Sequence, residues 1–563
     1  MDNKYYQLFV GTTSKDNFTP DLTQAKNSYE GLCYRIPSLI CPMDKEGNQR
    51  VLGMCDISES GNDHGRIQTV LRISDDGAES FGEMKVIFSP PVRKAPQDGK
   101  QYSSAFAIDP VMCQCNSGDI IMVVDVFPES KAIMQKNWLE TGSGYVEVNG
   151  RKYLALYEEK FKAEGGKINK SKAYTVREKG WIYTPDGERT NYYLPSKHSD
   201  EYAYETIGDM YYAVDGGEFI EKCPPMFPTE ENCKDIYVGN IFLNCERPAF
   251  SLSEPVRTVK RTVGPEKKGE EYSKYPCPET GAAPLCIMPT LRLFMMKSSD
   301  MGNTWSQPVD ITPQVKLDGE IFLGTGPGVA LKLQYQKDEK KNGRILVPVY
   351  NLKKTFVIYT DDEGKTWHRS QCSKNIDETQ LIESEDGTIF CFGRQVKLDK
   401  TPTSISRDGG ETWEKTKSTE LSAVRCQKSF LLLPPHSEAF PYAENMDKGK
   451  RYVVASCPSG DYQKKSVRYG GVVTLGEING DEIKWLTQKR VITEGVTGKW
   501  NNFYAYSSLG VLKNGEIVLL YEALPGSLLP VQKFTLKEIA EGEKAFGFPL
   551  PLITKIKRLF RKW

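Results

Sequence analysis

The sequence predicts an all-β fold of the propeller type into which a smaller β-rich segment is inserted. The first observation behind this prediction is an octet that recurs at residues 298–305, 360–367 and 406–413, with a worn copy at residues 74–81. The clear copies share a hydroxyl residue, Asp, Gly, Thr and a final Trp. Repeats of this kind limit the fold class before any single residue is interpreted.

The octet itself is typical of a tight β-hairpin turn. Asp and Ser or Thr side chains hydrogen-bond to nearby backbone N–H groups, Gly adopts a positive φ, and Trp packs back onto the sheet. Apolar, β-rich runs come directly before the turns, for example at residues 291–296 and 354–359. We therefore interpret the repeat as structural and not as catalytic.

The spacing of the octets is the second observation. Gly364 and Gly410 are 46 residues apart, and Gly302 and Gly364 are 62 residues apart. A unit of about 40–50 residues with four strands is the spacing of propeller blades, so each hairpin is expected to be half of a blade. Gly77 and Gly302 are separated by 225 residues, and an inserted module explains this gap.

Taken in order, the chain divides into five predicted segments. Residues 1–135 contain strand-like runs and form the first part of the propeller. Residues 136–245 have short alternating strands without a Trp-ended turn, which predicts the inserted β-rich domain. Residues 246–285 are rich in Pro, Glu and Lys and are expected to form a long loop. The blade rhythm resumes over residues 286–540.

The last segment, residues 541–563, is a basic tail with apolar residues at near-helical spacing. It is suited either to an anionic surface or to docking as a solvated terminal helix. The glycine-rich stretch 324–328 contains Pro327 and lacks the Lys of a phosphate-binding loop, so we interpret it as a close backbone turn.

Composition argues against several classes of protein. The formal net charge is zero and the isoelectric point is about 6.9, which disfavours nucleic acid as a partner. The 14 cysteines include no Cys-x-x-Cys pair and the chain has only 4 histidines, so free thiols are expected, with no metal site and no cofactor. The chain starts without an apolar leader, and its apolar runs are strand-sized, so neither a signal peptide nor a membrane span is expected. Localisation is left open.

A propeller brings residues from different blades together at its central channel, so charged residues within strand-like runs are candidates for a site. Five polar residues at strand-like positions where apolar ones would do are such candidates, four of them charged: Arg35, Glu378, Arg394, Arg468 and Tyr506. Any one of the arginines is also explained by a solvated strand end or a local ion pair, and Tyr506 alone by a core position.

Taken together, these residues resemble the exo-sialidases, or neuraminidases, of the bacterial and trypanosomal type. Tyr34-Arg35-Ile36-Pro37 is similar to the family's Phe/Tyr-Arg-Ile-Pro, the octets are similar to its Asp boxes, and residues 378–394 and 506–522 are similar to its late blades. The segments 174–178 and 308–315 look like those of the large clostridial and streptococcal members. The resemblance implies a six-bladed β-propeller with an inserted small β-rich domain.

The resemblance also implies how substrate would be bound. Arg35, Arg394 and Arg468 match the triad that clamps the carboxylate of sialic acid, and Glu522 matches the acid that holds the first arginine. A guanidinium is suited to this role because it stays charged and gives two parallel donors to a planar carboxylate.

For the chemical steps, Tyr506 matches the family's nucleophile and Glu378 its partner base. A carboxylate nucleophile would be repelled by the sugar's own carboxylate, whereas Tyr attacks while Glu takes its proton. Asp63 matches the acid/base that protonates the leaving oxygen and then activates water. Asp109 matches a carboxylate that meets the sugar's 4-hydroxyl.

One position departs from the family pattern. Members usually show Asp-x-Arg ahead of the acid/base, and here Ser58 follows Asp56 where that arginine is expected. The contact to the 4-hydroxyl is therefore open, and Arg66 is a candidate to replace it.

The implied activity is retaining exo-α-sialidase hydrolysis of terminal sialic acid on glycans, glycoproteins or glycolipids, by a monomer. The alternative is transfer of the sialic acid, to another sugar or to its own hydroxyl with an anhydro product, for which Trp500 or the insert would supply aromatic side chains. A sugar-binding protein without turnover would be expected to lose Tyr506, Glu378 or Asp63, and all three are present. A scaffold without a pocket would not need the three arginines.

Overall fold

The computed structural model describes the following residues, to which every structural statement refers: 5–10, 33–58, 63, 67–90, 105–128, 139–158, 168–177, 180–193, 210–214, 235–242, 285–351, 354–374, 376–395, 401–421, 424–459, 468–493, 496 and 501–545. The predicted long loop lies outside them apart from Leu285, and so do Arg66, Trp500 and most of the predicted basic tail.

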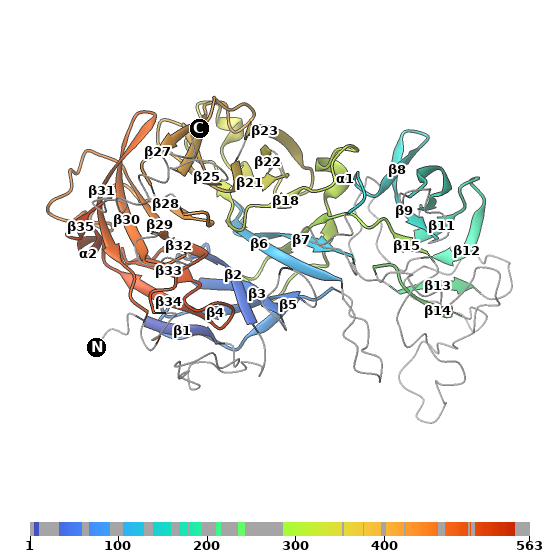
Figure 1. The fold of residues 1–563 in the computed structure, drawn as a ribbon, viewed down its shortest axis with the longest axis horizontal. Helices are drawn as coiled ribbons and strands as arrows, with labels where there is room; N and C mark the ends of the chain where they lie inside the picture. The colour runs from blue at the N-terminus through green and yellow to red at the C-terminus, as the bar shows by residue number, and fades with distance from the viewer. Residues whose placement is uncertain are drawn as a thin grey trace, which may run out of the picture.

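The described chain is all-β, as predicted (Figure 1). It has two short α-helices, α1 (Thr312–Val315) and α2 (Leu536–Ala540). Its strands form seven sheets, of which six have four or five strands. No described helix has the length and apolar character needed to cross a membrane. Nine described cysteines carry free thiols.

The six smaller sheets follow one another along the chain. Sheet 1 contains β2 (Cys33–Ile40), β3 (Val51–Ser58), β4 (Ile67–Ser74) and β5 (Lys85–Phe88). Sheet 2 contains β6 (Phe106–Gln114), β7 (Ile120–Phe127), β16 (Arg292–Ser298), β17 (Val309–Asp310) and β19 (Gly328–Val329). Sheet 3 contains β18 (Gly324–Thr325), β20 (Leu331–Lys332), β21 (Ile345–Tyr350), β22 (Lys354–Thr360) and β23 (His368–Lys374).

The later sheets have the same plan. Sheet 4 contains β24 (Ile376–Glu383), β25 (Ile389–Gln395), β26 (Thr401–Ser406) and β27 (Lys417–Thr419). Sheet 5 contains β28 (Ser429–Leu432), β29 (Tyr452–Pro458), β30 (Gly471–Asn479), β31 (Glu482–Arg490) and β35 (Glu543–Lys544). Sheet 6 contains β32 (Ser507–Val511), β33 (Ile517–Tyr521), β34 (Leu528–Phe534) and β1 (Tyr5–Val10).

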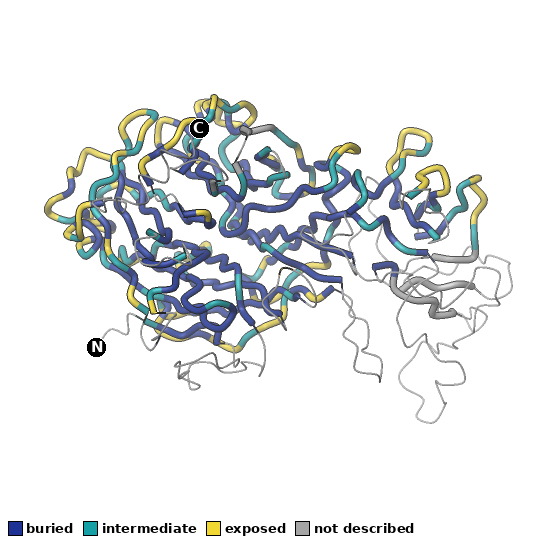
Figure 2. Tube along the Cα trace, viewed as in Figure 1, coloured by how far each residue is buried: buried dark blue, intermediate teal, exposed yellow. Residues whose placement is uncertain are grey.

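The first long strands of these sheets lie against one another. Strand β2 contacts β6 and β32, β24 contacts β21 and β28, and β28 contacts β32. These strands are mostly buried, and exposed stretches gather at the outer turns (Figure 2). The N-terminal strand β1 pairs antiparallel with β34, so the start of the chain is held in the last sheet.

The seventh sheet, called the insert sheet here, lies between β7 and β16 in the chain and to one side of the other six (Figure 1). Its strands are β8 (Tyr145–Val148), β9 (Arg151–Tyr157), β10 (Tyr174–Val176), β11 (Trp181–Tyr183), β12 (Arg189–Tyr193), β13 (Met210–Val214), β14 (Asp235–Asn240) and β15 (Cys286–Ile287). A buried hydrogen bond joins it to sheet 2: the Tyr145 hydroxyl of β8 donates to Asp310 Oδ2 at 3.1 Å. Within sheet 2, the same oxygen pairs with Arg292 Nη1 at 2.8 Å.

The octets form the predicted turns, and each joins the third and fourth strands of its sheet. In the copy at 360–367, the Thr360 hydroxyl accepts the N–H of Gly364 at 2.8 Å and donates to Asp362 at 2.8 Å. Asp362 in turn accepts the N–H and hydroxyl of Thr366, at 2.8 and 2.6 Å. The Trp367 indole N–H donates to the carbonyl of Gly364, whose φ is +94°. The structural interpretation of the repeat is therefore confirmed.

In the worn octet, the structure shifts the predicted glycine position by one residue. Ala78 occupies the place of Gly364, because its N–H donates to the Ser74 hydroxyl at 2.9 Å. Gly77 stands one residue earlier, where the other copies also have a positive φ. Ala78 has φ +65°, a conformation that is costly for a residue with a Cβ.

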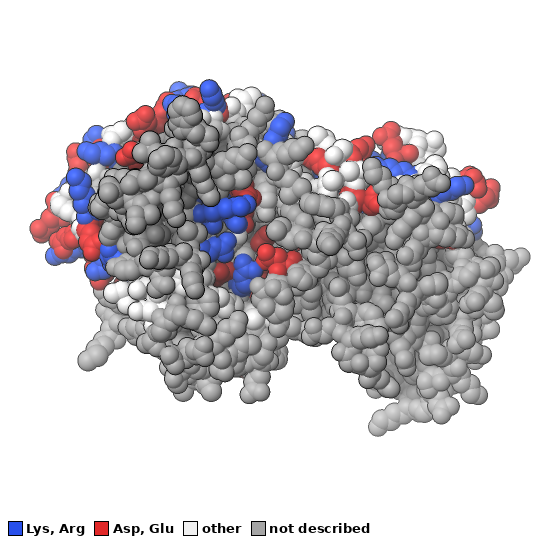
Figure 3. Space-filling model, in the orientation of Figure 1, with Lys and Arg blue, Asp and Glu red and all other residues white. Residues whose placement is uncertain are grey.

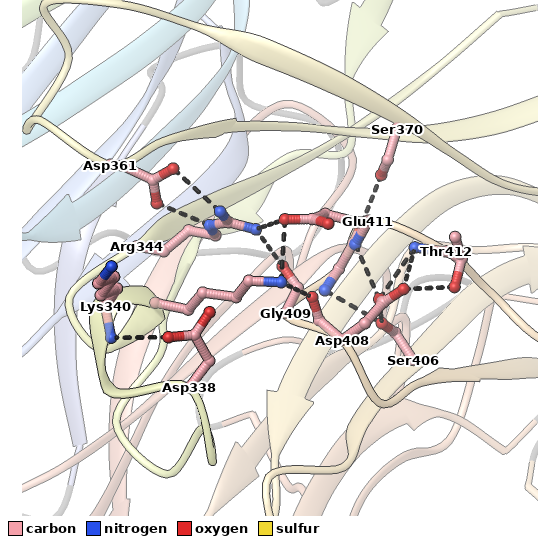
Figure 4. A network of polar contacts seen from close by, with 12 residues as sticks. Asp338, Lys340, Arg344, Asp361, Ser370, Ser406, Asp408, Gly409, Glu411 and Thr412 are labelled. Atoms are coloured by element: carbon pink, nitrogen blue, oxygen red, sulfur yellow. Dashed lines mark hydrogen bonds and ion pairs between the residues drawn. The ribbon is translucent and has the colours of Figure 1, made fainter.

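Ion pairs join neighbouring sheets at the end that carries the octet turns. Arg344, whose side chain is 6% exposed, contacts both carboxylate oxygens of Asp361 in sheet 3, at 2.7 and 2.9 Å, and Glu411 in sheet 4 at 2.9 Å (Figure 4). Arg50 does the same between sheets 1 and 2, because it pairs with Asp75 and donates to the Met301 carbonyl. The turns are thus linked across sheets.

The stretch 324–328 is a close backbone passage, as predicted. A Cβ on Gly326 would lie 2.7 Å from the carbonyl oxygen of Thr379, and a Cβ on Gly324 would lie 2.4 Å from Asp125. The Gln380 and Gln427 amides both donate to the Pro327 carbonyl, at 3.0 and 3.1 Å. This segment therefore packs closely between β24 of sheet 4 and β7 of sheet 2.

Candidate active site

Three first strands are distorted at the positions of predicted site residues. The register of β2 shifts between Arg35 and Ser38, that of β6 between Ile108 and Val111, and that of β24 between Ile376 and Thr379. Bulges of this kind re-aim side chains and are common beside active sites.

Two of these bulges contain a residue with positive φ followed by proline. Ile36 has φ +58° and precedes Pro37, and Asp109 has φ +63° and precedes Pro110. A non-glycine residue in this region costs on the order of 1 kcal/mol or more, so surrounding contacts must hold both backbones in place.

The first group of site residues is built around Arg35. Its Nη1 donates to Asp63 Oδ1 at 2.5 Å, and its Nε lies 3.6 Å from Glu522 Oε1. Glu522 is 2% exposed and also accepts the N–H of Ile36 at 3.0 Å, so it holds the strained bulge as well as the guanidinium. Burial lowers the pKa of Arg35, but the nearby carboxylates of Glu522 and Asp63 outweigh burial and raise it.

The second group joins Tyr506, Glu378 and Arg394. The Tyr506 hydroxyl donates to Glu378 Oε1 at 2.5 Å, and Arg394 Nη1 donates to Glu378 Oε2 and to the Tyr506 oxygen, both at 2.7 Å. Burial and the Glu378 carboxylate raise the pKa of Tyr506 well above its usual value, although Arg394 and Arg468 act in the opposite direction. The phenol is therefore protonated at neutral pH, and its proton has a carboxylate acceptor.

One side-chain contact and two backbone hydrogen bonds connect Arg468, Tyr506 and Glu522. The guanidinium carbon of Arg468 lies 5.3 Å from the centre of the Tyr506 ring, which is a cation–π distance. The Arg468 carbonyl accepts the N–H of Tyr504 at 3.0 Å, and Glu522 N–H donates to the Tyr506 carbonyl at 2.9 Å. Tyr506 lies directly before β32, not within it. It packs in a buried apolar cluster: Ile36, Val424, Cys426, Tyr469, Phe503, Ala505 and Tyr506.

Asp109 is held from both sides of its backbone. Its N–H donates to Asp56 Oδ2 at 3.1 Å, and its carbonyl accepts the Thr325 hydroxyl at 2.6 Å. The Thr325 N–H in turn donates to buried Asp125 at 2.9 Å. Burial, followed by the charges of Asp125 and Asp56, raises the pKa of Asp109 well above its usual range, which favours the neutral carboxylic acid.

All eight residues predicted for the site lie in this one region. Asp63 is its most accessible carboxylate, with a side chain 53% exposed. Figure 3 shows basic and acidic side chains side by side near the centre of the six-sheet body. Ser58, which stands where an arginine was expected, is buried at the end of β3.

Sequence reasoning missed several neighbours. Asp377 Oδ2 lies 3.9 Å from Arg394 Nε and 3.8 Å from Arg425 Nη2, and its place directly before Glu378 was an available signal. Asp125 is a single carboxylate in the apolar run of β7, which was a second signal. Tyr350 gave none, because a tyrosine at the end of a strand is an ordinary residue.

The site offers three kinds of chemistry. Its arginines can bind a planar anion, because guanidinium pairs with carboxylate through parallel hydrogen bonds. A buried phenol with a carboxylate acceptor can serve as an activated nucleophile. An exposed carboxylate at the rim can give or take a proton.

Comparisons with known proteins show that the chain is similar to sialidases. A family model described as BNR repeat-like domain matches residues 272–521. "Anhydrosialidase" of Macrobdella decora is 24% identical over 94% of this chain, and "Sialidase B" of Streptococcus pneumoniae is 26% identical over 91%. The chain spans 64% and 65% of the length of these two relatives.

Solved structures agree at the level of the fold. The intramolecular trans-sialidase of Ruminococcus gnavus superposes with a TM-score of 0.62 at 22% identity, over 94% of this chain and 98% of that one. NanB sialidase of Streptococcus pneumoniae gives the same TM-score and identity, over 95% and 71% of the two chains. Together with the BNR repeats, these likenesses identify the chain as a homologue of the sialidases.

Proposed function

We propose that the protein is an exo-α-sialidase that removes terminal α-linked sialic acid with retention, through a covalent bond to Tyr506. The observation that carries the proposal is the short hydrogen bond from the Tyr506 hydroxyl to Glu378, at 2.5 Å, with Arg394 bound to both groups at 2.7 Å. The sialidase relatives support the same activity. The substrates would be sialylated glycans, glycoproteins or glycolipids, and the monomeric state stays a prediction.

We infer further that the six smaller sheets are the blades of a propeller interrupted by a separate β-rich domain. The order of contacts between first strands, from β32 through β2 and β6 to β18, β21, β24 and β28, supports a ring. Pairing of β1 with β34 supports closure by the N-terminal strand. The predicted domain limits, including 136–245 for the insert, remain part of this proposal.

In the proposed mechanism, Arg35, Arg394 and Arg468 bind the carboxylate of sialic acid. Burial lowers the pKa of Arg35 and Arg394, but nearby carboxylates outweigh burial and raise it, so both stay charged at any working pH. Glu522 keeps Arg35 aimed into the site through contacts to its Nε and to the Ile36 N–H.

The ion pair between Asp63 and Arg35 has to break before Asp63 can act as the acid. It pairs with Nη1 of Arg35 at 2.5 Å, at the group that the substrate carboxylate also needs. Because Asp63 is 53% exposed, the substrate carboxylate can displace it without unpacking a core. Binding would thus release Asp63 as the proton donor only when a sialic acid is present.

The reaction then takes place in two displacement steps at the anomeric carbon. The Tyr506 oxygen attacks the anomeric carbon while its proton passes to Glu378, and the bond to the leaving oxygen breaks as Asp63 protonates that oxygen. In the second step Asp63 takes a proton from water, the water oxygen attacks the anomeric carbon, and Glu378 returns its proton to the leaving Tyr506 oxygen. Two inversions give net retention. Asp109, whose pKa is raised by burial and by the charges of Asp125 and Asp56, would meet the 4-hydroxyl.

A second candidate is intramolecular transfer, in which a hydroxyl of the bound sialic acid attacks in place of water and an anhydro sugar forms. It is favoured by the names of one relative and of one solved structure that this chain resembles. "Anhydrosialidase" of Macrobdella decora matches 94% of this chain, and a solved leech intramolecular trans-sialidase in complex with 2,7-anhydro-Neu5Ac superposes with a TM-score of 0.62.

A proton NMR time course of sialyllactose cleavage tests both candidates. Early release of α-sialic acid, which later mutarotates, is the expected result. A first product without a reducing centre would replace hydrolysis by the transfer candidate. A folded chain that binds sialic acid but gives no product from mildly acidic to neutral pH would overturn the assignments of Tyr506 and Asp63.

A further inference from the structure

Tyr350 lies at the edge of the site with a hydroxyl that has no role in the mechanism above. It ends strand β21, and its side chain is half-buried. Its hydroxyl makes no hydrogen bond to any residue that the structure describes. A phenol beside a polar site normally finds a partner, so this group is available to one from outside the protein.

Strand pairing places Tyr350 between two segments that hold site residues. On one side it pairs with Gly324, whose neighbour Thr325 donates to the Asp109 carbonyl at 2.6 Å. On the other side it pairs with Thr355, whose hydroxyl donates to the Asp377 carbonyl at 3.3 Å, directly before Glu378. Residues directly opposite one another share a face of a sheet, so the phenol lies on the face of the Thr355 hydroxyl and of the Cβ direction of Gly324, which points at Asp125 and Phe322. Thr325 comes next to Gly324 and faces the other way.

An aromatic contact fixes the ring of Tyr350 from behind. Its ring centre lies 5.2 Å from that of buried Phe322. The missing side chain at Gly324 makes room for Phe322, because a Cβ there would lie 2.5 Å from the Phe322 ring. Both rings belong to an apolar cluster that also contains Phe106 and Ile108, which come just before Asp109. The phenol is therefore positioned before any substrate binds.

The surrounding charges decide what the hydroxyl can do. Burial first, and then the charges of Glu378, Asp109, Asp377 and Tyr506, raise the pKa of Tyr350 well above its usual value. The group thus keeps its proton and is a hydrogen-bond donor. As a donor, the hydroxyl suits an oxygen acceptor.

We propose that Tyr350 is a substrate-binding residue that donates a hydrogen bond to an oxygen on a polar substituent of the bound sugar, on the side of the pocket between Asp109 and Glu378. This inference rests on the proposed function and deepens it by naming a specificity residue. Two substituents of sialic acid carry such an oxygen: the acylamino carbonyl at C5 and the hydroxyls of the three-carbon side chain.

The test compares Tyr350→Phe with wild type in steady-state cleavage of sialyllactose and in calorimetric titration with a 2,3-unsaturated sialic acid. The variant keeps the ring that stacks on Phe322 and removes only the donor. We expect kcat/KM and affinity to fall by about 3- to 10-fold, the range of one neutral hydrogen bond. Tyr359→Phe is the matched control, because Tyr359 lies at the octet end of β22 against Arg344, and it should change neither value.

Two shortened substrates distinguish the sources of the acceptor. If the acylamino carbonyl is the partner, the loss caused by Tyr350→Phe disappears with a 5-hydroxy sialic acid. If the side chain is the partner, it disappears with a sialic acid shortened to C7. Either pattern supports the inference.

The inference is overturned if wild type cleaves sialyllactose and Tyr350→Phe equals it in both kcat/KM and affinity. It is also overturned if the loss persists on both shortened substrates, since the hydroxyl then acts through the protein. A folded wild-type chain without turnover would instead refute the proposed function, a result that the wild-type measurement alone reveals.

Discussion

Replacing Glu378 by Gln separates the proposed base from everything else at the site. The variant keeps the size of the side chain but removes its charge. Glu378 accepts hydrogen bonds from the Tyr506 hydroxyl and from Arg394, so the amide NH2 of the variant must face one of these two donors and lose that hydrogen bond. Loss of a positioned general base costs about 10²- to 10⁴-fold in rate, or about 3–5 kcal/mol in the barrier. We expect this loss in kcat for sialyllactose.

The same variant should shift the titration of Tyr506 in the opposite sense from the rate. Glu378 raises the pKa of Tyr506, whereas Arg394 and Arg468 lower it. Removing the carboxylate leaves the two cations, so the pKa of Tyr506 should fall even though the enzyme is slower. Ultraviolet difference titration, with Tyr506→Phe as the subtraction reference, measures this shift.

Asp377→Asn is the control for Glu378→Gln. Asp377 is the adjacent carboxylate and lies 3.9 Å from Arg394, but no described contact joins it to the Tyr506 hydroxyl. Its loss should cost less than about 10-fold, in the range of a long ion pair. Activity of Glu378→Gln within 10-fold of wild type, or a pKa of Tyr506 that rises, would refute the base assignment.

Three further predictions concern other parts of the chain. Asp63→Ala should lower kcat/KM for sialyllactose by about 10²- to 10⁴-fold, but far less for an aryl sialoside whose leaving group needs no proton; equal losses would exclude the acid role. Asp56→Asn keeps an acceptor for the Asp109 N–H. Burial raises the pKa of Asp56 well above its usual range. Wild type therefore loses stability as pH rises through that pKa, whereas the variant has no carboxyl group here to titrate. The melting temperature of Asp56→Asn relative to wild type should therefore increase from pH 5 to pH 8, and a difference that is flat or falls would contradict this. Arg344→Met removes a buried ion-pair bridge between two sheets and should lower the free energy of unfolding by about 2 kcal/mol, seen as a lower midpoint of urea unfolding. The control Arg407→Met removes an ion-paired side chain that is 48% exposed and should lower it by less than about 1 kcal/mol. Equal midpoints for the two variants would contradict the bridge.

Local sequence was sufficient for the parts of the fold that depend on local chemistry. The octet turns form as predicted because each one is closed by hydrogen bonds among residues four or fewer apart, such as Asp362 with Thr366. The close passage at 324–328 follows from glycines whose missing Cβ atoms would collide with neighbours. One detail was wrong: Ala78, and not Gly77, takes the glycine place of the worn octet.

The candidate residues of the site came from the sequence, but only through their resemblance to a family, and their roles stay predictions. No local pattern relates Ile36 to Glu522, which lies 486 residues away and accepts its N–H. Tyr506 and Glu378 are 128 residues apart and meet at 2.5 Å. Asp377, Asp125 and Tyr350 are recognised as part of the site only in the tertiary structure.

The sequence by itself determined that the chain is all-β, where its repeated turns stand, and which charged residues interrupt apolar strands. Only the tertiary structure decided which of these charges share a site, because that depends on the order and tilt of whole sheets rather than on any short segment. It also decided how the acids titrate: burial, followed by the charges of Asp125 and Asp56, raises the pKa of Asp109 well above its usual range, and desolvation of this kind has no signal in a linear sequence.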